Sequence, residues 1–324
     1  MSKKKALITG IAGQDGSYLA EYLYKLDYEV YGIIRRNSTC EHQESRILHL
    51  DNKITTFYGD LLDISSLEKI LLEVMPDEIY NLAAQSHVRI SFDIPQFTAQ
   101  TNALGVLNLL ECYKNICPKA KLYQASSSEM FGNSIDSDNI QRLTTSMKPV
   151  SPYGCAKLFA FNITNNYKNS YNLHICNGIL FNHESPRRAS NFVTNKVVKA
   201  AVRIKLGLQQ KLELGNMDSC RDWGHAKDYV RAMHLILNHD NPDTWIVATG
   251  VTKSVRDMCD YVFKKLDLDY KDYVCQNLKY LRPEELKYLK GDSSKIRDEL
   301  GWKPEYSFET LMDEMIEFWM NELK

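Results

Sequence analysis

The sequence has no long apolar run and no excess of either charge. Across its 324 residues, no stretch approaches the roughly 18 continuous apolar residues of a membrane helix, so we expect no membrane partner. Lys and Arg number 40 against 41 Asp and Glu, which leaves no global field to hold nucleic acid. Any anion site must therefore be local.

Segments that would target the chain or bind a metal are also lacking. The basic start is followed by only three apolar residues, Ala6, Leu7 and Ile8, so we expect a strand there and not a signal peptide. The eight cysteines show no paired short spacing of the kind that binds zinc. We therefore expect no metal site and interpret the cysteines as reduced thiols of a cytoplasmic protein.

Short β-rich runs alternate with amphipathic stretches through the first half of the chain. Leu67, Ile70, Leu71 and Val74 follow helical spacing between two such runs. This alternation predicts an α/β fold with a Rossmann-like, doubly wound parallel sheet covered on both faces. The expected strands are residues 5–9, 29–34, 54–58, 78–82, 121–125 and 174–179.

The second half predicts a smaller α/β lobe. Ser254 and Asp257 have the spacing of a capping box that opens a helix ending near Lys265. A chain this long, with 44% hydrophobic residues, exceeds the size at which a single core usually stops growing. The other elements expected here are helices at 193–206, 226–237 and 308–320 and strands at 211–214 and 244–248.

A glycine-rich loop follows the first strand and opens a helix. Gly10, Gly13 and Gly16 lie there with two residues between successive glycines. Glycines in this place allow a tight turn and let a pyrophosphate approach the N–H groups at the helix N-terminus. The position between strand and helix favours a dinucleotide site over a mere glycine-rich turn.

Two arginines, Arg35 and Arg36, follow the second strand. An acidic residue there would accept the ribose hydroxyls of NAD, whereas adjacent guanidinium groups suit a 2′-phosphate. The pair therefore favours NADP over NAD. Alternatively, these arginines are solvated loop charges or oligomer contacts.

Tyr153 and Lys157 lie four residues apart after Pro152, which suits the start of a helix, so both side chains project from one helical face. A lysine ammonium beside a phenol is expected to lower the tyrosine pKa and prepare a general base. Residues 126–129 follow the strand at 121–125 and bring hydroxyls to the edge of the sheet where ligands bind. Together with the glycine loop, these features indicate hydride transfer. Taken singly, the Tyr/Lys spacing could belong to a helix surface, and the serines could form an ordinary serine-rich turn.

Longer runs of sequence carry a family resemblance. They are TGIAGQDGSYL at 9–19, QASSSE at 124–129, NGILFNHESPRR at 177–188, LGNMD at 214–218 and RDWGHAKDYV at 221–230. With these runs the chain resembles the extended short-chain dehydrogenase/reductase family, and within it the GDP-mannose 4,6-dehydratases, over nearly its whole length. The resemblance implies a lyase of nucleotide-sugar metabolism and deoxysugar biosynthesis.

The implied reaction converts GDP-α-D-mannose to GDP-4-dehydro-6-deoxy-α-D-mannose and water, with tightly bound NADP as a transient hydride carrier. Tyr153 would take the proton of the 4-hydroxyl, and Lys157 would hold the cofactor ribose and tune Tyr153. Glu129 would take the C5 proton and assist loss of the 6-hydroxyl. Ser127 stands where the family usually has threonine. A simple reductase would not need Glu129.

The resemblance also implies residues that bind the two ligands, which are NADP and a GDP-sugar, in a homodimer or homotetramer. The implied cofactor residues are Gly10, Gly13, Gln14, Asp15, Gly16, Arg35, Arg36, Asp60, Leu61, Leu82, Ala83, Ala84, Ser86, Tyr153, Lys157, His183 and Arg188. The implied substrate residues are Ser86, Ser127, Glu129, Asn182, Lys196, Arg221, Arg282 and Glu285. Arg221 and Arg282 match phosphate oxygens, or alternatively form structural ion pairs.

The expected domain division follows from these assignments. Residues 1–183 form the NADP-binding domain, to which 215–247 return, and residues 184–214 and 248–324 form the nucleotide-sugar-binding domain.

The sequence departs from the family pattern in three places. The segment at 37–42 lacks a longer loop, 265–281 is shorter, and Leu143 and Val150 replace a Glu and an Arg expected near the sugar. These changes leave open a GDP-linked manno-heptose as substrate. An NADP-dependent nucleotide-sugar epimerase or reductase would also fit the motifs, as would a catalytically silent dinucleotide-binding regulator.

Overall fold

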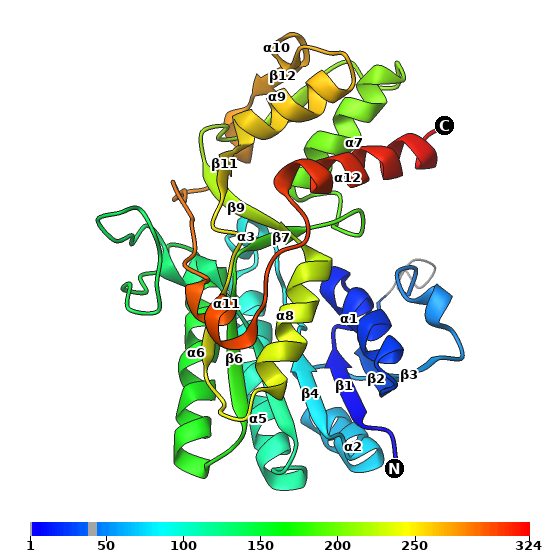
Figure 1. Cartoon of the computed structure of the whole chain (residues 1–324), viewed down its shortest axis with the longest axis vertical. Coiled ribbons are helices and arrows are strands. Elements are labelled where there is room, and N and C mark those ends of the chain that lie inside the picture. The colour runs from blue at the N-terminus through cyan, green and yellow to red at the C-terminus, as the bar shows by residue number, and fades with distance from the viewer. Residues whose placement is uncertain (1, 38–43) are drawn as a thin grey trace.

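A computed structural model describes residues 2–37 and 44–324, and its centre is a seven-stranded sheet (Figure 1). The strand order is β10-β6-β5-β4-β1-β2-β3, and all neighbouring strands are parallel. The strands are β1 (Lys5–Thr9), β2 (Glu29–Ile34), β3 (Ile54–Tyr58), β4 (Glu78–Asn81), β5 (Lys121–Ser127), β6 (Ile175–Leu180) and β10 (Thr244–Val247). The predicted fold class is confirmed.

Alternate residues of each strand enter different cores because side chains along a strand point to opposite faces. Ala6 and Ile8 pack with α1 (Gln14–Lys25) and α8 (Ala226–Asn238). Leu7, between them, packs on the other face with α2 (Ile64–Val74), α5 (Gly105–Ile116) and α6 (Pro152–Tyr171). Both faces of the sheet are therefore covered, as in other parallel sheets.

Short elements at the carboxyl ends of the strands shape the ligand side of the sheet. After β4 come α3 (Val88–Ser91) and α4 (Pro95–Ala99), which continues through a π turn (Gln100–Leu104) into α5. A 3-10 turn (Ser128–Phe131) follows β5 directly and carries Glu129. A further 3-10 turn (Leu48–Leu50) lies between β2 and β3.

A second lobe packs above this edge of the sheet (Figure 1). Its core lies between α7 (Val193–Lys205), α9 (Val255–Lys265) and α12 (Phe308–Glu322). The capping box of Ser254 and Asp257 is present at the start of α9. The remaining elements of this lobe are β7 (Asn182–Glu184), β8 (Leu212–Leu214), β9 (Cys220–His225), β11 (Thr252–Ser254), β12 (Val274–Gln276), α10 (Tyr270–Tyr273) and a 3-10 turn (Leu278–Tyr280). Helix α11 (Ser294–Leu300) packs on β10 and α8 of the first lobe.

The chain crosses between the lobes several times. β9 pairs with β7 and β11 in a three-stranded sheet, whereas α8 and β10 return to the first lobe. The domain division stays a prediction. The chain also returns to the first lobe near its C-terminal end, because Ile296 and Trp302 lie in the core of that lobe. There the Trp302 indole donates a hydrogen bond to the Asp228 carbonyl. Within 2–37 and 44–324, no helix combines the length and apolarity needed to cross a bilayer.

Candidate active site

Two neighbouring cavities lie at the carboxyl ends of the central strands. The glycine-loop cavity is bounded by residues of the 9–16 loop, by residues 33–35 and Asn37, and by residues 59–61. The interlobe cavity lies between residues 125–129 of the first lobe and residues 214–223 and 280–285 of the second. The residues that line both are Asp15, Leu82, Ala84, Ser86 and Arg188. A ligand in one cavity would therefore meet a ligand in the other.

The backbone makes the glycine-loop cavity. Gly10 has φ +70, and a Cβ there would lie 3.0 Å from the backbone of Ala83. A Cβ on Gly16 would lie 2.3 Å from the Gly10 carbonyl oxygen. Helix α1 begins at Gln14 with Gly13 as its N-cap, so its first N–H groups face the same loop. This cradle suits an anion held by backbone donors.

The two arginines after β2 differ in position. Arg35 lines the glycine-loop cavity, with its guanidinium 5.6 Å from the centroid of the Phe97 ring. Arg36 is not among the residues that line either cavity. Arg46, which the sequence motifs did not single out, lines the glycine-loop cavity and donates a hydrogen bond to the Ala12 carbonyl. The other predicted cofactor residues on this cavity are Gly10, Gly13, Gln14, Asp15, Gly16, Asp60, Leu61, Leu82, Ala83, Ala84, Ser86 and Arg188.

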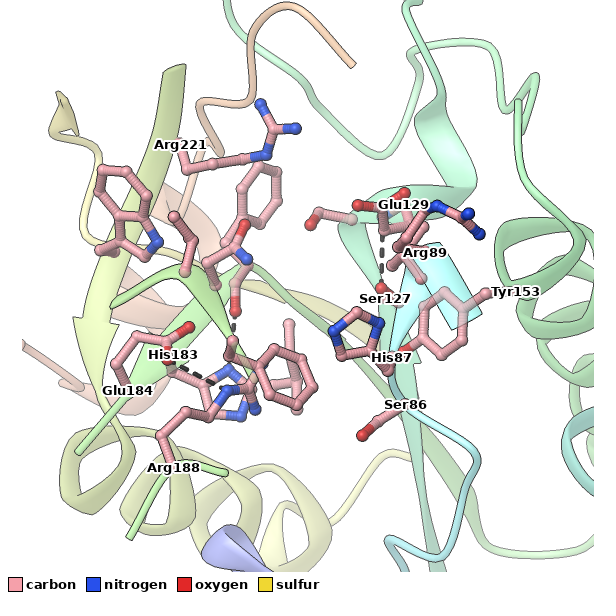
Figure 2. A pocket seen from close by; sticks show the side chains of 18 of the residues that line it. Ser86, His87, Arg89, Ser127, Glu129, Tyr153, His183, Glu184, Arg188 and Arg221 are labelled. Carbon is pink, nitrogen blue, oxygen red and sulfur yellow. Dashed lines mark hydrogen bonds and ion pairs between the residues drawn. The ribbon is translucent and has the colours of Figure 1, made fainter. Parts of the chain in front are cut away.

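All four predicted catalytic residues line the interlobe cavity. Ser127 ends β5, and its Oγ accepts a hydrogen bond from the Glu129 amide at 3.2 Å. Tyr153 and Lys157 come from the first turns of α6, whose N-cap is Ser151. The Lys157 Nζ donates to the Ala125 carbonyl at 2.9 Å. Figure 2 shows Ser127, Glu129 and Tyr153 on one side of the cavity and Arg221, Glu184 and Arg188 on the other.

Burial controls the protonation of this pair. It raises the pKa of Tyr153 to about 12, although a hydrogen bond with Ser127 acts in the opposite direction. It also lowers the pKa of Lys157 to about 8. Lys157 Nζ lies 5.9 Å from the centroid of the Tyr153 ring. Burial thus shifts the pKa of Tyr153 in the direction opposite to the one expected from the Lys157 ammonium.

The second lobe contributes a basic wall. Arg221 is 6% exposed and donates to the carbonyls of Cys220 and Leu286, and burial lowers its pKa to about 10. Lys196 Nζ lies 3.7 Å from the centroid of the Tyr280 ring. Arg282 Nη1 lies 3.4 Å from Oε1 of Glu129. The predicted substrate residues that line this cavity are Ser86, Ser127, Glu129, Asn182, Lys196, Arg221, Arg282 and Glu285.

His183 connects β7 to the glycine loop. Its Nε2 lies 2.7 Å from Asp15 Oδ2 and its Nδ1 lies 2.7 Å from the Phe181 carbonyl, so both ring nitrogens have partners within the chain. Burial alone would lower the pKa of His183, but Asp15 outweighs it and the pKa is raised. Arg188 pairs with Glu184 at 3.0 Å. His183 and Arg188 thus line the interlobe cavity, and Arg188 also faces the glycine loop.

Comparison with known proteins identifies the family. The family model for GDP-mannose 4,6 dehydratase matches residues 7–315. The chain is 49% identical to GDP-mannose 4,6 dehydratase 1 of Arabidopsis thaliana over 97% of this chain and 89% of that protein. It is 45% identical to the human GDP-mannose 4,6 dehydratase over 96% and 90%. The chain belongs to the GDP-mannose 4,6-dehydratase family.

Solved structures of other proteins share the fold. DesIV, a dTDP-glucose 4,6-dehydratase from Streptomyces venezuelae, matches with a TM-score of 0.86 at 24% identity, over 98% of this chain and 97% of that chain. RMD from Pseudomonas aeruginosa matches with a TM-score of 0.80 at 22% identity, over 98% and 100%. At these identities the likeness establishes the fold.

Buried polar atoms without a protein partner also lie on the interlobe cavity of this dehydratase-family chain. They are Oε2 of Glu129, Oγ of Ser219 and the indole Nε1 of Trp223. Leaving such atoms unpaired costs on the order of 1–3 kcal/mol each, so they indicate a polar ligand. Sequence reasoning missed Ser219 and Trp223, although both lie in or beside the 221–230 run that carries the family resemblance.

The departures from the family pattern lie in different surroundings. Tyr280, within the shorter segment at 265–281, lines the interlobe cavity. Neither Leu143 nor Val150 is among the residues that line the interlobe cavity, and Val150 packs against a core of the first lobe. The expectation that these changes cluster around the sugar stays a prediction. Of the segment at 37–42, residues 38–42 lie outside the described residues. In the part of the chain that the structure describes, no group of three His, Cys, Asp or Glu side chains could hold a metal ion.

Proposed function

We propose that this protein converts GDP-α-D-mannose to GDP-4-dehydro-6-deoxy-α-D-mannose and water, with NADP as a hydride carrier. The observation that carries the proposal is the meeting of Tyr153 and Glu129 in one cavity that opens onto the glycine loop. Tyr153 suits proton removal from a hydroxyl, and Glu129 suits removal of a proton from carbon. Both are needed for a 4,6-dehydration.

The residues of the glycine-loop cavity fit a dinucleotide. Glycines that leave no room for a Cβ, followed by a helix N-terminus, accept a pyrophosphate. The structure of DesIV contains NAD and that of RMD contains NADPH, so the fold accepts either cofactor. Arg35 on this cavity favours the 2′-phosphate of NADP. Held by the glycine loop and Arg35, a bound nicotinamide cofactor would supply reversible hydride transfer beside the sugar.

Tyr153 removes the proton of the 4-hydroxyl. To do so its pKa has to fall from about 12, and the Ser127 hydrogen bond is a contact of the chain that favours the phenolate. Lys157, with a pKa of about 8, is mostly charged at neutral pH, and its ammonium favours the phenolate as well. We assign Lys157 in addition to the cofactor ribose.

Glu129 carries out the elimination. Once C4 is a ketone, the C5 proton becomes acidic, and the buried carboxylate takes it. The resulting carboxylic acid then gives a proton to the departing 6-hydroxyl, which leaves as water. An epimerase would not need this carboxylate, so Glu129 decides the class of reaction.

The second-lobe wall holds the nucleotide diphosphate. Arg221 and Lys196 supply positive charge on a cavity of a chain that has no net field to attract an anion. Guanidinium groups pair with phosphate oxygens in a bidentate geometry. We assign Asn182 and Glu285 to the same bound nucleotide-sugar.

Mass spectrometry of the product tests the proposal. The purified protein incubated with GDP-mannose should yield a product lighter by one water, with no net change in nicotinamide. Glu129→Gln should block water loss and still exchange hydrogen at C4. A product of unchanged mass would instead support an epimerase. Parallel incubation with a GDP-linked manno-heptose tests the choice of sugar.

A further inference from the structure

The two oxygens of the Glu129 carboxylate lie in different surroundings. Oε1 faces Nη1 of Arg282 at 3.4 Å, whereas Oε2 is buried without a protein partner. The Glu129 residue is 8% exposed and lines the interlobe cavity. One oxygen is thus held by the second lobe, and the other is available to a ligand.

Arg282 is itself held in place. Its backbone N–H donates to Oε1 of Glu285 at 2.9 Å, and its Nε lies 3.9 Å from Oε2 of the same carboxylate. Both oxygens of Glu285 are therefore directed at Arg282. Glu285 therefore does more than contact the substrate. A chain of contacts runs from Glu285 through Arg282 to Glu129.

A third residue fixes the distance between the two segments. Asn133, just after the turn that carries Glu129, donates its amide to the Glu285 carbonyl at 3.2 Å. Its side-chain oxygen accepts from the Lys287 amide at 3.0 Å. Arg221 holds the same segment through the Leu286 carbonyl at 3.1 Å. The residues that follow Arg282 are thus joined to both walls of the cavity.

We propose that Arg282 is a positioning residue that holds Oε1 of Glu129 and thereby directs Oε2 at the C5 hydrogen of the sugar. In this step the C5–H bond breaks, the proton moves to Oε2, and the electron pair enters the enolate of the 4-ketone. The proton then moves from Oε2 to the departing 6-hydroxyl, and water leaves. This inference rests on the proposed dehydration and gives Arg282 a role in the elimination, beyond attraction of the diphosphate.

The test compares Arg282→Gln with Arg221→Lys. Both arginines line the cavity, but Arg221 donates to the carbonyls of Cys220 and Leu286 and not to Glu129. Three quantities are measured: the affinity for GDP by calorimetry, the incorporation of deuterium at C5 in heavy water, and the near-ultraviolet absorbance of reduced nicotinamide at saturating GDP-mannose. Glu129→Gln is the reference for a blocked elimination.

For Arg282→Gln we expect kcat to fall about 100-fold, since a positioned acid–base group contributes on the order of 10² to 10⁴. Reduced nicotinamide should accumulate and C5 exchange should slow, as in Glu129→Gln. Arg221→Lys should mainly raise KM and show no accumulation. Normal C5 exchange and no accumulation at saturating substrate in Arg282→Gln would overturn the inference and leave Arg282 as a diphosphate ligand alone.

Two milder variants keep the test decisive if Arg282→Gln does not fold. Arg282→Lys keeps the positive charge and should recover part of the C5 exchange. Recovery should be incomplete because a lysine cannot reproduce the forked geometry of the guanidinium group. Glu285→Gln weakens the hold on Arg282 and should slow C5 exchange about tenfold at saturating GDP-mannose. Unchanged C5 exchange in both variants would contradict the inference. A wild-type protein that leaves GDP-mannose intact would instead refute the proposed function.

Discussion

The two cavities are built in different ways. The glycine-loop cavity is mostly backbone and small side chains from consecutive strand ends of one lobe. The interlobe cavity brings charged and hydroxyl side chains together with apolar ones from segments far apart in the chain, such as those of Glu129 and Arg282. Shape therefore controls the first cavity, and electrostatics controls the second. Substitutions should act sterically in one and chemically in the other.

The largest expected effect on turnover comes from removing the hydroxyl oxygen of Tyr153 from the interlobe cavity. Tyr153→Phe keeps the buried ring but loses the proton acceptor, so turnover of GDP-mannose should fall about 10³-fold. GDP affinity measured by calorimetry should stay within about twofold, because Tyr153 is placed at the sugar. A variant that kept its turnover would remove Tyr153 from the mechanism.

The second prediction uses the buried ammonium of Lys157. Its pKa in the folded protein is about 8, below the ordinary 10.5, so the unfolded chain binds more protons between these values. The contribution of Lys157 to the free energy of unfolding should thus rise by about 3 kcal/mol as pH rises from about 8 to 10.5. Urea denaturation of the wild type and of Lys157→Met across this range measures the difference. A constant difference would contradict the depressed pKa.

The third prediction concerns shape in the glycine-loop cavity. A methyl group on Gly16 would meet the backbone of Gly10 and Ile11, which cannot move away like a side chain. Gly16→Ala should therefore cost about 2 kcal/mol of stability and weaken NADP binding. Gly207→Ala is the matched control, since no atom lies within 4 Å and only its φ of +72 opposes a side chain. Its cost should be about 1 kcal/mol, with NADP binding retained. Equal effects on NADP binding would contradict the account.

The smallest expected effect separates the two arginines. Arg35→Ala should lower the preference for NADP over NAD about tenfold, which corresponds to about 1.4 kcal/mol. Arg36→Ala should change this preference less, because Arg35 lines the cavity and Arg36 does not. Dissociation constants for both cofactors and both variants measure this. A larger effect at Arg36 would reverse the assignment.

The sequence predicted the regular elements well where apolar patterns are strong. Strands β1, β2 and β3 have the predicted bounds, whereas β5 extends to Ser127 because its ladder continues into polar residues. Strand β9 was missed, since its sequence contains charged residues that are buried, including Arg221 and Asp222. The Asp222 carboxylate is satisfied by distant partners, the amides of Thr249 and Gly250.

The composition of the site was also predictable, but its electrostatics were not. Spacing on a helix and at a strand end was enough to select Tyr153, Lys157 and the 126–129 run. The pKa of Tyr153 depends on its burial in the folded chain, which no local spacing reveals. The contact of Glu129 with Arg282 joins residues 153 positions apart and required the fold.

The central claim is that one hexose lies between Tyr153 and Glu129, beside a single nicotinamide. GDP-mannose carrying deuterium at C4 tests it most directly, with the position of the label in the product read by nuclear magnetic resonance. We expect the deuterium removed from C4 to appear at C6 of the same sugar. A product whose C6 hydrogen comes from solvent, or a label that remains at C4, would contradict it.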